Sequence, residues 1–478
     1  MATTARFATG FLAVASLAAG AWLPESICTR IITTDVAIIG GGASGAYAAV
    51  RLKEDFNKSV VLIEKRGLLG GHVSTFDDPE TGTPFDFGVQ TFNDYGPARA
   101  FFQRMNVTVG VAPRTPLVSR YVDFKTGLPV DFTPPSAADR TAALQKFLNV
   151  TQAYEQYFLP GYWDFPAPGD IPADLLLPFG EFVNKYGIHA AVNQVFEVTG
   201  MGVGDMANAL TMYVLGAFGP PMIRAFIGLG TTFTPTSRRN LELYEAIEAR
   251  LGHDVLYNST AVQTIRTSLG HTLWVQNTNG THTLVRARKL LLAIEPTAAN
   301  MAPFSLDATE NTLLTKFRHQ RIHAGIVTHP SLPANTSLVN TPASAAPANY
   351  LALPTGNFNA RVDHMGGGSA NFRVLMVGNE TFGAAEAQAL VRGNFEALVA
   401  AGTVRTAGAE NPLEFKAWAD HGAMHMHVSA DEIRGGFVQR LYALQGRRAT
   451  WWTGGAFSVQ FQAVLWAFDD ILLPKIVA

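Results

Sequence analysis

The chain has 478 residues, of which 47% are hydrophobic and 15% are charged. This length is sufficient for a large core and indicates more than one structural unit. A formal net charge of -2 lacks the basic excess of nucleic-acid-binding proteins, so the composition argues against nucleic acid and favours a small-molecule partner. The single cysteine, Cys28, excludes internal disulfides and a cysteine-based metal cluster.

Residues 1–21 are predicted to be a secretory signal peptide. Arg6 precedes an apolar segment that starts at Phe7, and the small residues Ala19, Gly20 and Ala21 follow it. This segment is too short to span a bilayer, and no later stretch is long and apolar enough, so no membrane span is expected. We expect a secreted or secretory-pathway protein that is N-glycosylated, because N-x-[ST] sites occur at Asn57, Asn106, Asn149, Asn258, Asn279, Asn335 and Asn379.

A strand, a glycine turn and a helix follow in "DVAIIGGGASG", residues 35–45. Its glycines have the G-x-G-x-x-G spacing that lets a backbone approach a pyrophosphate at a helix N-terminus. Glu64 ends the next predicted strand, where an acid accepts hydrogen bonds from ribose hydroxyls. The predicted dinucleotide ligands of this segment are Gly40, Gly42, Ser44, Gly45, Glu64 and Arg66.

Three later segments carry a family resemblance. Gly70, Gly71 and His72 follow the ribose acid in "GLLGGHVSTF", "LLLAIEP" spans residues 290–296, and "WWTGGAFSVQFQAVLW" spans residues 451–466. Together with the glycine turn, they resemble the flavin-containing amine oxidase superfamily. The resemblance implies FAD, with the Val262 backbone at the adenine. It also implies a terminal flavin-binding turn at Gly454, Gly455 and Phe457, followed by a helix that starts near residues 458–460.

Four further features lie in the predicted leader, in "ICTRIITTDVAIIGGG" (27–42), in "LGGH" (69–72) and in the "VSADEI", "LYALQG" and "WTG" segments of residues 428–454. With them the chain resembles, within that superfamily, fungal FAD oxidoreductases of secondary metabolism of the beta-cyclopiazonate dehydrogenase type. The wider family has arginine where this chain has His72. Two interpretations of His72 are open. One is a covalent bond to the flavin 8α-methyl group, which the resemblance implies and for which imidazole is nucleophilic enough; the other is a hydrogen bond to phosphate or a nearby carbonyl.

The catalytic residues cannot be assigned from the sequence. Amine oxidases of the wider family place a lysine after the segment corresponding to "LLLAIEP", but no lysine lies between Lys289 and Lys316. The histidines in "HGAMHMHVS" lack a carboxylate partner, so no metal site is predicted. If this segment is a strand, His425 and His427 share one face.

The predicted fold is α/β, with a Rossmann-like FAD-binding domain and a discontinuous, mixed α+β substrate domain. The FAD-binding domain is assigned to residues 33–110, 232–300 and 428–478, and the substrate domain to residues 111–231 and 301–427. Residues 300–425 are read as largely irregular, with loops rich in alanine, proline and asparagine.

The predicted function is FAD-dependent oxidation of a small apolar natural-product intermediate, with ring closure as one outcome and O2 or another acceptor regenerating the cofactor. Three alternatives remain: a polyenoic fatty acid double-bond isomerase, an amine oxidase, and a non-catalytic flavin-binding protein of a pathway.

Overall fold

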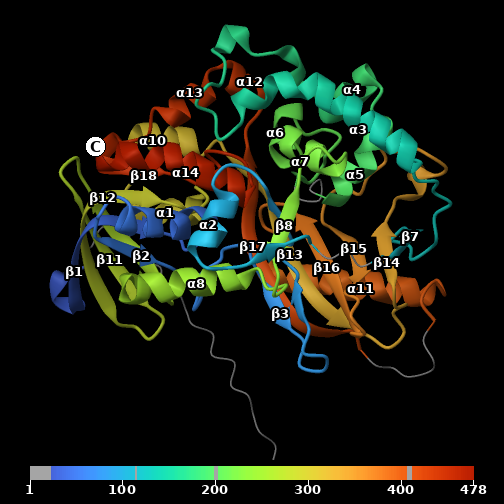
Figure 1. The fold of residues 1–478 in the computed structure, drawn as a ribbon, viewed down its shortest axis with the longest axis horizontal. Coiled ribbons are helices and arrows are strands. Elements are labelled where there is room, and N and C mark those ends of the chain that lie inside the picture. The colour runs from blue at the N-terminus through green and yellow to red at the C-terminus, as the bar shows by residue number, and fades with distance from the viewer. Residues whose placement is uncertain (1–22, 113–115, 199–202, 406–411) are drawn as a thin grey trace, which may run out of the picture.

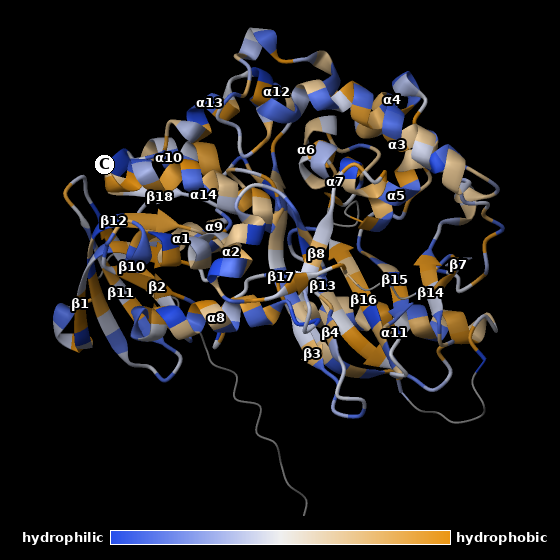
Figure 2. Cartoon of the chain, in the orientation of Figure 1, coloured by the Kyte–Doolittle hydropathy of each residue, from blue (hydrophilic) through white to orange (hydrophobic). Residues whose placement is uncertain are grey.

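The structure, a computed structural model, describes residues 23–112, 116–198, 203–405 and 412–478. The predicted signal peptide lies outside these residues. Two large sheets lie beside each other, and a layer of helices covers the top of the second sheet (Figure 1). Figure 2 shows that apolar residues follow the strands of both sheets and helix α14 (Gln462–Val477), which is consistent with burial of these elements.

The first sheet has seven strands in the order β10-β11-β12-β1-β2-β9, and β18 pairs with β12. Strands β1, β2, β9, β12 and β18 run parallel, whereas β11 pairs antiparallel with both of its neighbours, β10 and β12. The bounds are β1 (Cys28–Ile39), β2 (Val60–Ile63), β9 (Val255–Leu256), β10 (Ser259–Arg266), β11 (His271–Asn277), β12 (His282–Leu292) and β18 (Thr450–Trp452). Helix α1 (Ala43–Glu54) connects β1 to β2, so the predicted β-α-β unit is confirmed.

The second sheet has six strands in the order β17-β13-β16-β15-β14-β7. Their bounds are β7 (Val118–Val122), β13 (Arg318–Thr328), β14 (Thr336–Asn340), β15 (Phe358–His364), β16 (Asn371–Gly378) and β17 (Glu414–His427). One face packs on α11 (Ala384–Ala400) through buried residues such as Val374, Met376 and Val391. The prediction of a largely irregular segment over residues 300–425 is therefore wrong, because its strands are separated by long loops that mask their pattern.

The remaining helices and strands surround the two sheets. Among them, α3 to α7 form the helical layer above the second sheet, and α12 and α13 lie beside it (Figure 1). Their bounds are β3 (Thr75–Asp77), β4 (Pro84–Asp86), β5 (Phe92–Asn93), α2 (Ala98–Arg104), β6 (Val109–Gly110), α3 (Ala137–Thr151), α4 (Phe179–Tyr186), α5 (Val192–Val198), α6 (Thr211–Ala217), α7 (Pro220–Phe226), β8 (Thr232–Pro235), α8 (Leu241–Leu251), α9 (Ala298–Met301), α10 (Ala308–Leu314), α12 (Ala430–Arg434) and α13 (Phe437–Tyr442).

The strands of the first sheet come from residues 28–63, 255–292 and 450–452, and those of the second from residues 118–122 and 318–427. The exact limits of the two predicted domains stay a prediction. Within the described residues, no helix is long and apolar enough to cross a membrane.

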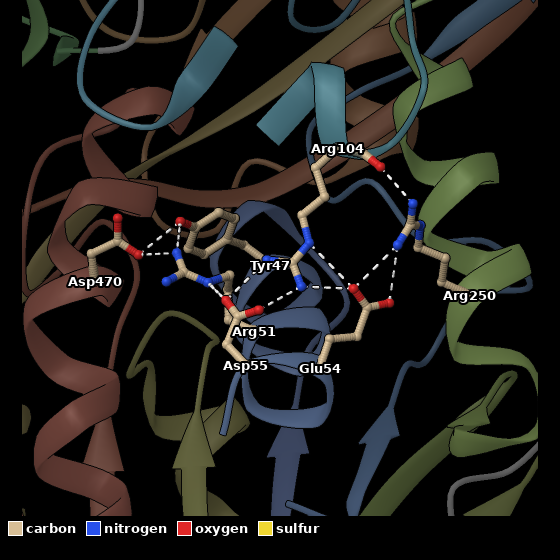
Figure 3. Close-up of polar contacts among 7 residues, drawn as sticks. All are labelled: Tyr47, Arg51, Glu54, Asp55, Arg104, Arg250 and Asp470. Atoms are coloured by element: carbon tan, nitrogen blue, oxygen red, sulfur yellow. Dashed lines mark hydrogen bonds and ion pairs between the residues drawn. The ribbon is translucent and has the colours of Figure 1, made fainter. Parts of the chain in front are cut away.

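A network of charged side chains fixes the C-terminal half of α1 (Figure 3). The Tyr47 hydroxyl donates to Asp470 Oδ1 on α14 at 2.7 Å. Arg104 on α2 donates from Nη2 to Glu54 Oε2 at 2.7 Å, and Arg250 on α8 donates from Nη1 to the same oxygen at 3.1 Å. Helix α1 is thereby tied to three neighbouring helices, which fixes the direction in which its N-terminus points.

Candidate flavin site

Four loops meet at one edge of the first sheet because four parallel strands end there side by side. Ile39 pairs with Ile63 and Leu292, and Leu292 pairs with Trp452. Ligands of parallel α/β sheets bind outside the carboxyl ends of the strands. A cavity of 220 Å3, here called the narrow cavity, lies at this edge and is lined by Gly40, Gly42, Ala43, Ser44, Glu64, Lys65, Arg66, Gly71, His72, Val89, Ala293, Ile294, Glu295, Asn300, Asp420, His421, Gly422, Ala423, Gly454, Gly455, Gln460, Gln462 and Leu465.

Two predicted glycines that line the narrow cavity are in direct backbone contact. A Cβ built on Gly71, whose φ is +56°, would lie 2.8 Å from the Gly42 Cα. A Cβ on Gly42 would lie 3.5 Å from the Gly71 Cα, and no other described heavy atom is within 4 Å of it. The Gly70 amide donates to the Gly41 carbonyl at 2.9 Å and joins the two glycine segments. The backbone is thus bare where a flat or charged group approaches.

The N-terminus of α1 presents unpaired donors to the narrow cavity. Its N-cap, Gly42, has no side-chain cap, and Ser44 Oγ has no hydrogen-bond partner among the described residues. The positive end of the helix dipole and the nearby Lys65 and Arg66 all favour an anion. This donor set fits the diphosphate of a dinucleotide.

Glu64 is held in place by backbone donors. Its Oε2 accepts from the Gly41 amide at 2.7 Å, and its Oε1 accepts from the Arg66 amide at 2.9 Å. A carboxylate has about four acceptor sites, so two remain for ribose hydroxyls. Arg66 also donates from Nη2 to the Gly71 carbonyl at 2.7 Å, and it supplies a cation in the region where the wider family uses the arginine that His72 replaces.

His72 lies where the narrow cavity meets a second one. Its ring contacts the ring of His421 on β17, with centroids 5.2 Å apart. Burial, together with the positive charge of Arg66, lowers the pKa of His72 to about 4, although a hydrogen bond to the His421 backbone opposes the shift. The His72 imidazole is therefore neutral at physiological pH and retains a nucleophilic nitrogen.

The second cavity, here called the wide cavity, has a volume of 620 Å3. His72, Val89, His421 and Gln460 line both cavities, so the two are adjacent. Its walls come from the second sheet and the helical layer, and they include the apolar residues Phe87, Leu117, Val198, Met222, Phe226, Ile322, Met365, Leu375, Met424 and Phe461. None of the wall residues is lysine in the part of the chain that the structure describes. Lys316 instead pairs with Glu432 at 2.7 Å.

The histidine segment on β17 is a strand, but the expected face sharing is wrong. His425 has a φ of +53°, and the pairing with β13 shifts register between Arg318 and Gln320. This bulge breaks the alternation of side chains. His421 and His425 line the wide cavity, whereas His427 packs against Tyr213 with ring centroids 5.8 Å apart. No group of three potential metal ligands is formed by the described residues.

Four predicted residues do not line the narrow cavity: Gly45, Gly70, Val262 and Phe457. Gly45 packs against the turn, because a Cβ there would lie 1.9 Å from the Gly40 carbonyl oxygen. Phe457 is 1% exposed and stacks on Trp452. The predicted helix start near residues 458–460 is wrong, since α14 begins at Gln462 and the Ser458 hydroxyl donates to the Pro160 carbonyl instead.

Glu295 is a cavity residue that sequence reasoning missed. It follows β12 and accepts from Gln460 Nε2 at 3.3 Å, and its Oε2 has no described partner. Burial raises the pKa of Glu295 to about 7, against hydrogen bonds from Gln460 and the Gly455 and Ala456 amides. The sequence offered one signal: Glu295 is the only charged residue of the apolar segment "LLLAIEP" and lies directly before Pro296.

Replacing Glu295 with glutamine is expected to stabilise the flavin-free chain at high pH only. A carboxyl pKa raised by folding means that stability falls as the pH rises from about 4.5 to 7, because the folded state holds a proton that the unfolded state releases. The variant lacks this loss, so its advantage is about 3 kcal/mol at pH 8 and near zero at or below pH 4. Denaturant unfolding at both pH values measures it, with the exposed Glu80→Gln as control. An advantage of equal size at both pH values would contradict the pKa assignment.

Comparisons with known proteins agree with this geometry. Residues 38–105 match the model of the NAD(P)-binding Rossmann-like domain. Beta-cyclopiazonate dehydrogenase of Aspergillus oryzae is 34% identical over 93% of this chain and 93% of its own length. FAD-dependent oxidoreductase pigF of Monascus ruber is 34% identical over 93% of this chain and 92% of its own length. The chain belongs to the family of fungal FAD-dependent oxidoreductases.

The solved structures confirm the fold of this oxidoreductase. A fatty acid isomerase of P. acnes that produces CLA superposes with a TM-score of 0.71 at 17% identity, over 92% of this chain and 98% of its own. Cyclohexylamine oxidase of Brevibacterium oxydans gives a TM-score of 0.61 at 17% identity, over 93% and 98% of the two chains. The predicted amine oxidase-like α/β fold is therefore confirmed. The donor set of the narrow cavity fits FAD: Gly42, Ser44 and Arg66 would hold its diphosphate and Glu64 its ribose.

Proposed function

We propose that this oxidoreductase dehydrogenates a small apolar natural-product intermediate in a secondary-metabolite pathway. The observation that carries the proposal is the adjacency of the two cavities, which share His72, Val89, His421 and Gln460 as lining residues. A substrate in the wide cavity would therefore lie next to a cofactor in the narrow one. When bound, FAD supplies a hydride acceptor, with O2 or another acceptor as the final oxidant.

The residues of this chain bind, orient and shield. Apolar walls such as Phe87, Leu375 and Phe461 exclude water from the donor carbon. His72, His421 and His425 are neutral at physiological pH, because burial lowers the pKa of each ring. A neutral imidazole can accept a proton from the substrate. His72 and His421 line both cavities, and His425 lines the wide one.

Anaerobic mixing of the holoenzyme with candidate apolar substrates tests the activity. Lasting loss of the oxidised-flavin absorbance, with one dehydrogenated product per flavin, is the expected result. Product without lasting bleaching would identify a double-bond isomerase, the alternative that shares its fold with the P. acnes isomerase. No change with any ligand that binds would favour a non-catalytic flavin-binding protein. Amine oxidation is disfavoured, since no lysine is found among the described residues that line the wide cavity.

We further propose that the flavin is bound covalently through His72. Two observations support it: the ring lines both cavities, and burial keeps its nitrogen unprotonated. The bond joins an imidazole nitrogen to the flavin 8α carbon. Each atom gives up one hydrogen, and O2 accepts the two hydrogen atoms. Acid precipitation tests this proposal, because covalently bound flavin stays with the precipitated protein.

Secretion with N-glycosylation is also proposed. All seven asparagines of the N-x-[ST] sites are exposed, which is compatible with attached glycans. Four of them, Asn57, Asn106, Asn258 and Asn335, adopt positive φ values. Asparagine tolerates this conformation better than most residues, so backbone geometry alone accounts for asparagine at these four positions. Removal of N-glycans with an endoglycosidase should lower the apparent mass of the protein from its native source, and an unchanged mass would contradict the proposal.

A further inference from the structure

Two arginines lie on the wall that the second sheet contributes to the wide cavity. Arg373 on β16 and Asp363 on β15 are directly opposite each other, and Arg361 lies two residues before Asp363 on the same face. All three line the wide cavity, and their side chains are 10%, 11% and 17% exposed for Arg373, Asp363 and Arg361 respectively. Strands β15 and β16 lie side by side below α5 and α7, which contribute Glu197 and Met222 to the opposite wall (Figure 1).

Asp363 is neutralised by one of the two arginines. Its carboxylate accepts from Arg361 Nε at 2.9 Å and from the Ser337 hydroxyl at 2.5 Å. Arg361 also donates from Nη2 to Ser337 Oγ at 3.1 Å. These bonds form a closed set in which one positive charge balances one negative charge.

Arg373 has no comparable partner. Its nearest acid is Asp363, with 3.6 Å between Nη2 and Oδ2, and this is its one ion pair among the described residues. A guanidinium carries five N–H donors in a planar fork. Arg373 lines the wide cavity and none of its nitrogens is a buried atom without a partner, so donors that Asp363 leaves free face the cavity. A ligand anion there would complete the pairing of a guanidinium that shares its acid with Arg361.

Glu197 does not provide that anion. It makes no ion pair within 4.0 Å in the described part of the chain, although burial raises its pKa and the charge of Arg361 opposes that shift. Asp363 is thus the one ion-paired acid that the described residues offer to both arginines, in a cavity that many apolar side chains also line.

The second sheet sets the distance from Arg361 and Arg373 to His421, which lines the narrow cavity. Arg373 and Arg361 lie two and three strands from β17, which carries His421. His421 is also displaced along the strands from the register of both arginines. With about 4.8 Å between neighbouring strands and about 3.3 Å per residue along them, the separation is about 15 Å for each arginine. A ligand held at the arginines thus extends an apolar part of that length toward His72.

We propose that Arg373, supported by Arg361, binds an anionic oxygen group of the substrate, a carboxylate or an acidic enolate. The substrate is then an amphipathic acid whose apolar end lies at the cofactor. This inference rests on the proposed function and specifies the substrate class of the same site. Guanidinium groups bind such anions through paired N–H···O bonds, which fixes the orientation of the ligand as well as its charge.

Three ligands of equal chain length test the inference in the holoenzyme: decanoate, 1-decanol and decylamine, each below its micellar concentration. Isothermal titration calorimetry at low salt and neutral pH should show decanoate binding at least tenfold more tightly than 1-decanol, and decylamine most weakly. Equal binding of decanoate and 1-decanol, or tightest binding of decylamine, would overturn the inference. This comparison requires no variant.

The variant Arg373→Gln assigns the effect to its residue. We expect decanoate affinity to fall to that of 1-decanol while 1-decanol binding is unchanged. Arg120→Gln is the matched control, because Arg120 lies exposed on β7 of the same sheet. An unchanged decanoate affinity in the Arg373 variant would refute the assignment.

This experiment fails separately from the test of the proposed function. A holoenzyme that is reduced by neutral apolar substrates but shows no preference for decanoate keeps its function and loses this inference. A chain that binds no FAD loses the proposed function, whatever the calorimeter reports for the three ligands.

Discussion

Replacing Gly42 with valine is expected to reduce bound flavin at least tenfold without unfolding the protein. The φ of -76° and ψ of -164° at Gly42 are accessible to valine, so the backbone needs no adjustment. The new side chain would project beside Gly71 over the bare N-terminus of α1, where a diphosphate would bind. A tenfold loss corresponds to about 1.4 kcal/mol of binding energy, which the steric block should exceed.

Flavin content per chain and the free energy of unfolding of the flavin-free protein measure the two halves of this prediction. The second should fall by about 1 kcal/mol, because glycine is favoured over valine at an N-cap, and the protein should remain folded. Gly393→Ala is the control, since Gly393 is exposed on α11 and a Cβ there meets nothing within 4 Å. A Gly42→Val protein with one flavin per chain would show that the diphosphate lies elsewhere.

Replacing His72 with alanine is expected to release the flavin on acid precipitation. In the unchanged protein the flavin should remain with the precipitate, because a covalent bond survives denaturation. In the variant it should be found in the supernatant, although the native protein still binds it through Gly42, Ser44 and Arg66. His72 is the histidine that lines both cavities from the glycine segment itself.

His421→Ala is the matched control for this experiment. Its ring lies 5.2 Å from that of His72 and lines the same two cavities, and burial also lowers its pKa. We expect the His421 variant to keep flavin in the precipitate, and mass spectrometry should find the flavin on the peptide that contains His72. Release of flavin by the unchanged protein would exclude the covalent bond. Retention of flavin in the precipitate of the His72 variant would show that the bond is to another residue.

The glycine segments were accessible to sequence analysis because their chemistry is local. A tight turn between a strand and a helix requires glycine at fixed spacing, so Gly40, Gly42 and Gly45 identify it without knowledge of the fold. The acid at Glu64 follows from the same unit. These residues come within 30 positions of one another, and the structure brings Gly40, Gly42 and Glu64 to one cavity. The turn at Gly454 and Gly455 was found through family resemblance.

Only the tertiary structure showed the residues that line the wide cavity. Arg361, Asp363 and Arg373 lie in a segment whose loops mask its strands, and their charge balance depends on distances across β15 and β16. His421 on β17 contacts His72, although 349 positions of sequence separate them. The bulge at His425 decides which histidine faces the cavity. Sequence determines which backbone turns can bind a cofactor, since glycine spacing acts over a few residues. The position of a charge inside a cavity depends on strand pairing between distant segments, which no local pattern encodes.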